Sequence, residues 1–224
     1  MNKFLFPIYA VALGVLLVVL NKNKNPRHFK LLLSFSGAFL LAITLFELLP
    51  EVYGHLNTKW TGVLIMCGIV LQIFLESLSK GAEHGHLHGH EENRRFPWLL
   101  FISLCIHSLL EGFPIHQHND MVYGVIIHKV PIAMLIAGYL LESKFSKPQM
   151  VAFLLVFALM TPLGTWISNE VPQLSDYTLY INALVIGIFL HISTIILFES
   201  SEGHKFNFAK LLTIIAAVLI AYFI

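Results

Sequence analysis

The chain has 224 residues, of which 57% are hydrophobic and only 12% are charged, and its mean hydropathy is +0.76. This composition lies outside the range of soluble domains of this length, and a formal net charge of +1 gives no sign of nucleic-acid binding. Both cysteines, Cys67 and Cys105, lie within apolar runs, which argues against a disulfide framework or a Cys-x-x-Cys metal site. The sequence therefore predicts an all-α integral membrane protein.

Eight apolar segments approach the roughly 20 residues that a helix needs to cross about 30 Å of hydrocarbon. They lie near residues 4–20, 30–50, 59–79, 97–116, 120–142, 148–168, 177–199 and 207–224. The first is interpreted as a span, because it lacks a small-residue cleavage site and runs into a basic loop. Most connections are short and polar, so we expect one transmembrane domain over residues 1–224, with a longer histidine-rich loop at 80–96.

Lysine and arginine are concentrated in the first, third, fifth and seventh connections. Short loops rich in these residues stay in the cytoplasm. We therefore expect a cytoplasmic histidine-rich loop and two extracytoplasmic termini. The short loops favour a cytoplasmic (inner) cell membrane of a bacterium, although a eukaryotic membrane stays open.

The segments that begin at Gly37 and Gly187 resemble each other. The stretches "GAFLLAITLFELLPE" and "GIFLHISTIILFE" share Gly-x-Phe-Leu, and a threonine follows at the same offset, at Thr44 and Thr194. With the orientation above, the two segments cross the membrane in opposite directions. Inverted repeats of this kind are typical of transporters.

Ionisable side chains lie inside two consecutive apolar segments. His107 and Glu111 are four residues apart, so a helix places them on one face. The next segment carries His128 and Lys129. A charge at mid-membrane costs about 2.5–3.5 kcal/mol on insertion scales, and such residues usually face a bundle interior and mark a pathway. These four residues need a common explanation.

Imidazole nitrogens and carboxylate oxygens suit Zn²⁺ and other first-row divalent ions. His107, Glu111 and His128 supply two nitrogens and one carboxylate from antiparallel neighbouring helices. Lys129 is unexpected beside a dication, so it either neutralises Glu111 or occupies the place of a second ion. The alternative is that each group only hydrogen-bonds across helices and stabilises the bundle.

Three short motifs resemble those of the ZIP family of divalent metal transporters. They are "HSLLEG" at 107–112, "HKVP" at 128–131 and "ELLPE" at 47–51. The layout is also similar to that of the family, which has eight spans, outward termini and a histidine-rich cytoplasmic loop between the third and fourth spans. The resemblance implies a ZIP-like bundle of eight transmembrane helices, which we expect to contain the inverted repeat.

The resemblance implies a metal site at His107, Glu111 and His128. Two-metal members have Asn where this chain has Ser108 and Glu where it has Lys129. We therefore expect a single-metal site in which Lys129 stands in for the second cation. The family resemblance further implies that Zn²⁺ is a transported substrate of a protein that is not an enzyme, with Fe²⁺, Mn²⁺ and Cd²⁺ as further candidates.

Two further groups of polar residues lie along the expected path of the ion. The loop "EHGHLHGHEE" is typical of weak metal binding, as a sensor or buffer or as a linker with incidental affinity, through His84, His86, His88 and His90. The pathway candidates in other spans are Glu47, Glu51, His191 and Glu199. His191 lies in an apolar run and must find a partner, whereas Glu76 is interpreted as reaching the membrane interface.

The leading interpretation is a divalent metal transporter that moves the ion into the cytoplasm. As the resemblance implies, the first, fourth, fifth and sixth helices would move against the other four. The expected partners are divalent metal ions and the lipid bilayer, and a homodimer is the candidate assembly. The alternative is an intramembrane zinc-dependent hydrolase that holds a water-activating ion permanently. A structural or sensor protein without flux would leave the buried charges unexplained.

Overall fold

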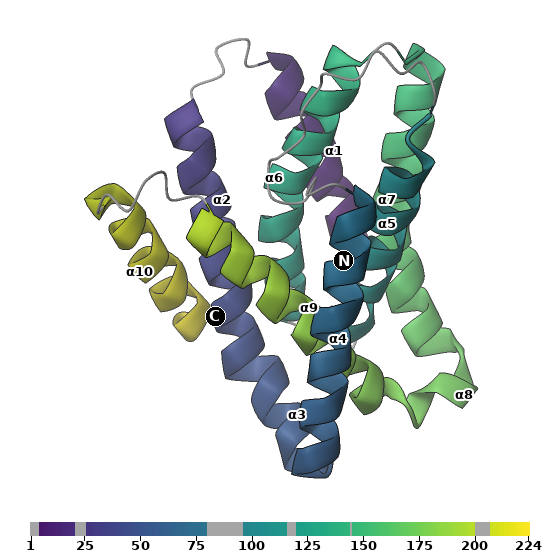
Figure 1. Ribbon diagram of the computed structural model, residues 1–224, viewed down its shortest axis with the longest axis vertical. Helices are drawn as coiled ribbons and strands as arrows, with labels where there is room; N and C mark the ends of the chain where they lie inside the picture. Colours follow the sequence, from purple (N-terminus) through teal and green to yellow (C-terminus); the bar gives the residue numbers. More distant parts are fainter. Residues whose placement is uncertain (1–4, 21–25, 80–95, 116–119, 144, 200–206) are drawn as a thin grey trace.

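The computed structural model describes residues 5–20, 26–79, 96–115, 120–143, 145–199 and 207–224. Within these ranges the regular elements are helices and no strand is present, which confirms the predicted all-α class. The long helices run up and down between the two ends of the molecule, and the short helices α3 and α8 lie at its lower end (Figure 1).

The elements are named here in chain order. They are α1 (Phe6–Leu20), α2 (Pro26–Ile43), the π-helix η2 (Thr44–Leu48), α3 (Leu49–His55), α4 (Thr58–Ser79), α5 (Trp98–Leu110), the 3₁₀-helix η4 (Phe113–Ile115), α6 (Met121–Glu142), α7 (Lys147–Glu170), α8 (Pro172–Ser175), α9 (Thr178–Glu199) and α10 (Phe208–Phe223).

Six helical stretches of the described chain are long and apolar enough to cross a membrane. They are Arg27–His55, Thr58–Ser79, Trp98–Ile115, Met121–Glu142, Lys147–Glu170 and Thr178–Phe198. The apolar helices α1 and α10 are shorter, with 15 and 16 residues. At 1.5 Å per residue they rise only about 23 Å, less than the ~30 Å of a typical hydrocarbon core. The chain is a multi-pass integral membrane protein, and the number of eight crossings stays a prediction.

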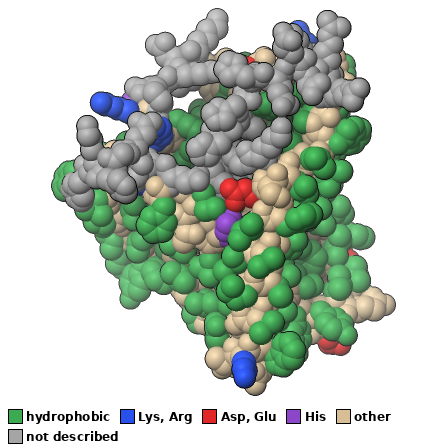
Figure 2. Space-filling model, in the orientation of Figure 1, with side chains coloured by type: hydrophobic (Ala, Val, Ile, Leu, Met, Phe, Trp, Pro, Cys, Tyr) green, Lys and Arg blue, Asp and Glu red, His purple; other side chains and the backbone are tan. Residues whose placement is uncertain are grey.

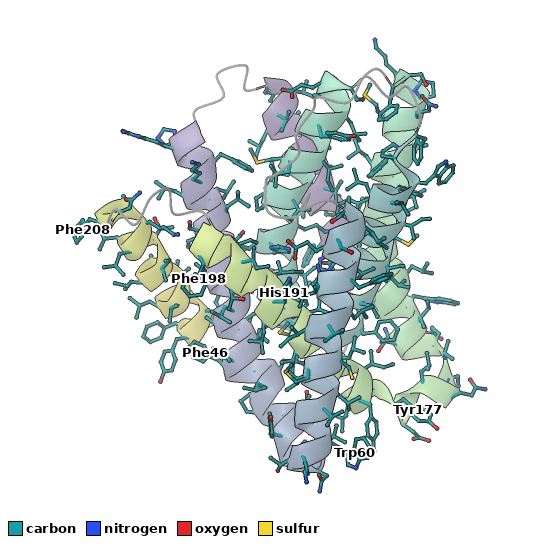
Figure 3. The ribbon with its side chains drawn as sticks, viewed as in Figure 1. Phe46, Trp60, Tyr177, His191, Phe198 and Phe208 are labelled. Carbon is teal, nitrogen blue, oxygen red and sulfur yellow. The ribbon has the colours of Figure 1, made fainter. Side chains whose placement is uncertain are left out.

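The outer surface is suited to lipid. The face shown in Figure 2 is mostly hydrophobic below the residues drawn in grey, with basic atoms in one place at its lower tip. Trp60 and Tyr177 point outward at the lower end, and Phe198 and Phe208 project from α9 and α10 (Figure 3). Aromatic side chains of this kind are common at membrane–water interfaces and on lipid-facing surfaces.

The long helices form two groups. In one, α4 packs on α9, and α2 packs on both α9 and α10; in the other, α1 packs on α6 and α7, and α5 packs on α7. The groups meet where α2 contacts α6 and where α4 contacts α5. The two similar segments of the sequence begin on α2 and α9, which pack against each other and run in opposite directions (Figure 1), and the first continues through η2 into α3.

Two of the predicted spans contain irregular turns near a proline. The predicted helix 97–116 is α-helical only to Leu110, and a turn and η4 follow. Pro114 lacks an N–H and disfavours helical backbone at the residue before it, which explains the early end. In the span near 30–50, the Leu49 N–H bonds the Thr44 carbonyl in a wider π-turn just before Pro50.

Pairs of glycines close two helix crossings. Where α4 crosses α9, a Cβ on Gly68 would collide with the backbone carbonyl of Leu184, and a Cβ on Gly187 would collide with the backbone of α4. The crossing of α5 and α7 is built in the same way from Gly112 and Gly164. Small residues allow such close backbone approach in membranes. The second crossing fixes the distance between two of the helices that form the site below.

We predict that Gly164→Ala lowers the free energy of unfolding by about 1–3 kcal/mol, because the added methyl group must push α7 away from α5. The matched control is Gly138→Ala on α6, where a Cβ would meet no atom within 4 Å. That change should be neutral or slightly stabilising, because alanine favours helix by about 1 kcal/mol over glycine. Thermal unfolding of the purified variants in detergent measures both effects, and equal melting temperatures would contradict the close crossing.

Candidate metal centre

The predicted ligands lie where three helices meet. His107 is in the last turn of α5 and Glu111 follows that helix directly, while His128 and Lys129 are in the middle of α6. Thr161 of α7 reaches them from a third direction. None of these side chains is more than 3% exposed. The structure therefore buries groups of both charges inside one helix group.

Lys129 forms an ion pair with Glu111 at the centre of this cluster. The Lys129 ammonium donates to Oε1 of Glu111, to the Ser108 hydroxyl at 2.7 Å and to the Thr161 hydroxyl at 2.7 Å. An ammonium has three protons, so these acceptors can use all of them. The Phe157 ring centroid lies 4.6 Å from Nζ and adds a cation–π contact. The buried charge is both neutralised and hydrogen-bonded.

The two carboxylate oxygens of Glu111 have different surroundings. Oε1 accepts from Lys129, and it accepts from the Thr161 hydroxyl at 2.6 Å. The Ser108 hydroxyl is further from Oε1, at 3.4 Å. Oε2 lies 3.5 Å from Nε2 of His107, one helical turn earlier on the same face. The protein thus holds Oε1 tightly and directs Oε2 toward an imidazole.

His128 lies beside this pair but does not close a metal site. Its ring centroid is 6.3 Å from that of His107, and the rings are nearly perpendicular at 81°. Among the described residues, no three His, Cys, Asp or Glu side chains are close enough together to hold a metal ion. Nδ1 of His107 is buried and has no hydrogen-bond partner within the described part of the chain. The arrangement brings the predicted donors near each other while Lys129 holds Glu111.

The structure adds Thr161 to the cluster, which the sequence analysis did not find. Thr161, Thr165 and Ser168 form a buried stripe on one face of α7. The Thr165 hydroxyl donates to the Gly112 carbonyl at 2.8 Å, and the Ser168 hydroxyl donates to the Phe113 carbonyl at 3.3 Å. The hydroxyls therefore satisfy backbone carbonyls of the buried turn and η4 that follow α5. The i, i+4, i+7 spacing of the three residues was the available signal.

His191 pairs with Glu76 rather than with the central cluster. Nε2 of His191 on α9 lies 2.7 Å from Oε2 of Glu76 on α4, and the side chains are 12% and 22% exposed. His191 thus has the partner that its apolar surroundings require. Acidic and histidine side chains lie together on the mostly hydrophobic face in Figure 2, and Figure 3 shows His191 where α9 passes behind α4. Glu76 therefore bonds His191 and does not merely extend to the membrane–water interface.

The other candidates are placed as follows. Glu47 is exposed on η2, and Glu51 is partly buried on α3. Glu199 is the last residue of α9, and its side chain lies outside the described residues. The loop histidines also lie outside the described residues: His84, His86, His88 and His90. Their proposed contacts with metal stay predictions.

Taken together, apolar spans and a buried cluster of histidine, glutamate and lysine define a multi-pass membrane protein with an ionisable site in its bundle interior. The family model described as ZIP zinc transporter matches residues 80–224, which include α5 to α10. The chain belongs to the ZIP zinc transporter family.

Three related proteins carry names that agree with this family. A protein named zinc transporter ZIP1 from Danio rerio is 22% identical over 182 residues, covering 58% of this chain and 60% of that protein. A protein named zntD from Dictyostelium discoideum is 24% identical over 156 residues, covering 57% of this chain and 22% of that protein. A protein named zinc transporter ZIP1 from Takifugu rubripes is 30% identical over 96 residues, covering 40% of this chain and 31% of that protein. The chain spans 60% or less of the length of each.

We predict that Lys129→Met and Glu111→Gln each lower the free energy of unfolding by about 3–5 kcal/mol, because each leaves a buried charge without its partner. The double variant should lose less than the sum of the two single losses. Lys147→Met, at an exposed lysine on α7, is the control and should have little effect.

Thermal unfolding in detergent with a metal chelator present measures these losses without any contribution from bound ions. Additive losses in the double variant would show that Lys129 and Glu111 do not interact in the folded protein.

Proposed function

We propose that the chain transports divalent metal ions across the membrane into the cytoplasm, with Zn²⁺ as the main substrate. The observation that carries the proposal is the buried cluster of His107, Glu111 and His128 in a chain of the ZIP family. Buried ionisable groups inside a membrane bundle mark ion pathways. Fe²⁺, Mn²⁺ and Cd²⁺ are further candidate substrates, because donor chemistry separates first-row neighbours poorly.

The distances in the cluster fit a zinc site that is partly assembled. Two donors at about 2.0–2.1 Å from a tetrahedral Zn²⁺ are about 3.4 Å apart. Nε2 of His107 and Oε2 of Glu111 are 3.5 Å apart, so they match one edge of that tetrahedron. Two imidazoles on one zinc ion would have ring centroids about 5 Å apart. His128 at 6.3 Å must therefore move about 1 Å to become the third ligand.

A site with three protein ligands keeps a fourth position open, which allows the ion to enter and leave. Oε1 of Glu111 is paired with Lys129, so Oε2 is the carboxylate oxygen that remains for the ion. The arrangement does not support the hydrolase alternative, because Glu111, the carboxylate that would act as the base toward water, is paired with Lys129.

The arrangement of helices supports a moving site. The cluster belongs entirely to α5, α6 and α7, which pack with α1 in one helix group. We propose that this group moves against α2, α4, α9 and α10 and so exposes the site to each side in turn. The proposal includes eight crossings, extracytoplasmic termini and a single transmembrane domain.

The proposed route continues beyond the cluster. Glu76 and His191 form a second pair of metal-binding groups on α4 and α9, near the cytoplasmic end in the proposed orientation. The loop histidines and Glu199 would follow on the cytoplasmic side, and Glu47 and Glu51 lie toward the external side. Carboxylate and imidazole groups along the route would exchange the ion in short steps.

The proposed function predicts uptake of zinc by liposomes that contain the purified protein, followed with a trapped zinc-sensitive dye. His107→Ala should abolish this uptake, because it removes one of three ligands. His28→Ala is the control, since His28 is exposed at the start of α2. A wild-type protein that retains zinc tightly and shows no flux would overturn the proposal.

We further predict that Lys129→Glu creates a second zinc site, if the ammonium stands in for a second cation. The measurement is the number of zinc equivalents bound by the purified protein, determined by calorimetric titration. His84, His86, His88 and His90 are replaced by alanine in both proteins, so that the loop adds no equivalents. One equivalent in both proteins would contradict this role of Lys129.

A further inference from the structure

We propose that Thr161 is a positioning residue of the metal site. Its hydroxyl holds Oε1 of Glu111 against Lys129, so that Oε2 stays directed toward the transported ion. The proposal rests on the proposed function, and it adds a residue from α7 to a site that the sequence placed on α5 and α6.

The Thr161 hydroxyl contacts both members of the ion pair at once. Its single proton can reach Oε1 of Glu111 at 2.6 Å or the Ser108 carbonyl at 3.0 Å, and the shorter bond to the charged carboxylate is the stronger one. The same oxygen accepts from Nζ of Lys129 at 2.7 Å. A hydroxyl has one proton and two lone pairs, so it can make both bonds together. Thr161 therefore bridges the carboxylate and the ammonium at the same oxygen.

Ser108 does not duplicate this role. Its hydroxyl lies 3.4 Å from Oε1 of Glu111, a long contact, and also faces the Phe157 carbonyl at 3.3 Å and the Thr161 hydroxyl at 3.0 Å. The Thr161 bond to Glu111 is the shorter of the two, by 0.8 Å. Removal of the Thr161 hydroxyl would leave Oε1 with Lys129 and a weak contact to Ser108.

The backbone around Thr161 is held in place. The Gly112–Gly164 crossing brings α7 against the end of α5, and Thr165 bonds the Gly112 carbonyl one turn further along. Threonine is also stiff at χ1 because it is β-branched. The side chain of Thr161 is fully buried. The hydroxyl is thus a fixed point against which the carboxylate can be oriented.

This orientation has a consequence for the metal ion. A carboxylate whose Oε1 is held by two donors presents one oxygen to the ion, rather than two. One oxygen and two imidazole nitrogens favour Zn²⁺ over Mn²⁺, which prefers oxygen-rich sites. Groups that orient metal ligands in this way typically contribute 10–100-fold to metal affinity or activity.

The test compares Thr161→Val, which removes the hydroxyl and keeps the shape, with Thr161→Ser, which keeps the hydroxyl. Thr165→Val is the matched control, because Thr165 lies on the same face of α7 and its hydroxyl bonds only backbone carbonyls among the contacts found. Zinc uptake by proteoliposomes gives KM and maximal rate. Calorimetric titration with zinc alone gives Kd, with alanine at the loop histidines in every protein so that the loop binds no zinc.

Thr161→Val should raise KM and Kd for zinc about tenfold, with a higher ratio of Mn²⁺ to Zn²⁺ uptake. Thr161→Ser and Thr165→Val should keep KM near the wild-type value. If Thr161→Val does not fold, Thr161→Cys replaces it and should give an intermediate KM, because a thiol is a weak donor.

An unchanged KM and Kd in Thr161→Val would overturn the proposal, as would equal effects of Thr161→Val and Thr161→Ser. A purely structural role would lower the melting temperature of Thr161→Val and Thr165→Val alike and leave KM unchanged. Failure of wild-type uptake with intact zinc binding would refute the proposed function alone, because Kd would still report on Thr161.

Discussion

The structure depends on the ion pair between Lys129 and Glu111. Neither charge is stable alone inside a membrane bundle, and a buried pair is stable only when its other protons and lone pairs are also bonded. Ser108 of α5 and Thr161 of α7 provide those bonds to groups on α5 and α6. The packing of α5, α6 and α7 and the chemistry of the site therefore depend on the same hydrogen bonds.

The end of α5 follows from the same constraint. Glu111 stands just beyond the last turn of the helix, where its side chain can face both Lys129 and His107. The turn and η4 that follow α5 leave the Gly112 and Phe113 carbonyls outside a regular helix, and the hydroxyls of Thr165 and Ser168 on α7 bond them. Glycines at the crossing allow α7 to come close enough to do so. An irregular helix end is thus tolerated because the neighbouring helix completes it.

The sequence predicted the all-helical class and the residues around the ion pair. It did so because His107 and Glu111 share a helix face and because a charged residue within an apolar span is costly and usually functional. It missed Thr161, since a threonine in a membrane helix can equally bond its own backbone. It also missed the pairing of Glu76 with His191, which depends on how α4 crosses α9 and has no local signal. The π-helix before Pro50 likewise had no local signal in the sequence except the proline itself.

The central claim is that the transported ion is bound by His107, Glu111 and His128. The most direct measurement is zinc K-edge X-ray absorption of the full-length protein with one equivalent of zinc and with alanine at the loop positions His84, His86, His88 and His90. The account predicts two imidazole nitrogens and carboxylate oxygen at about 2.0–2.2 Å, and one imidazole after His128→Ala. The same number of imidazoles in both proteins, or an all-oxygen shell, would contradict it.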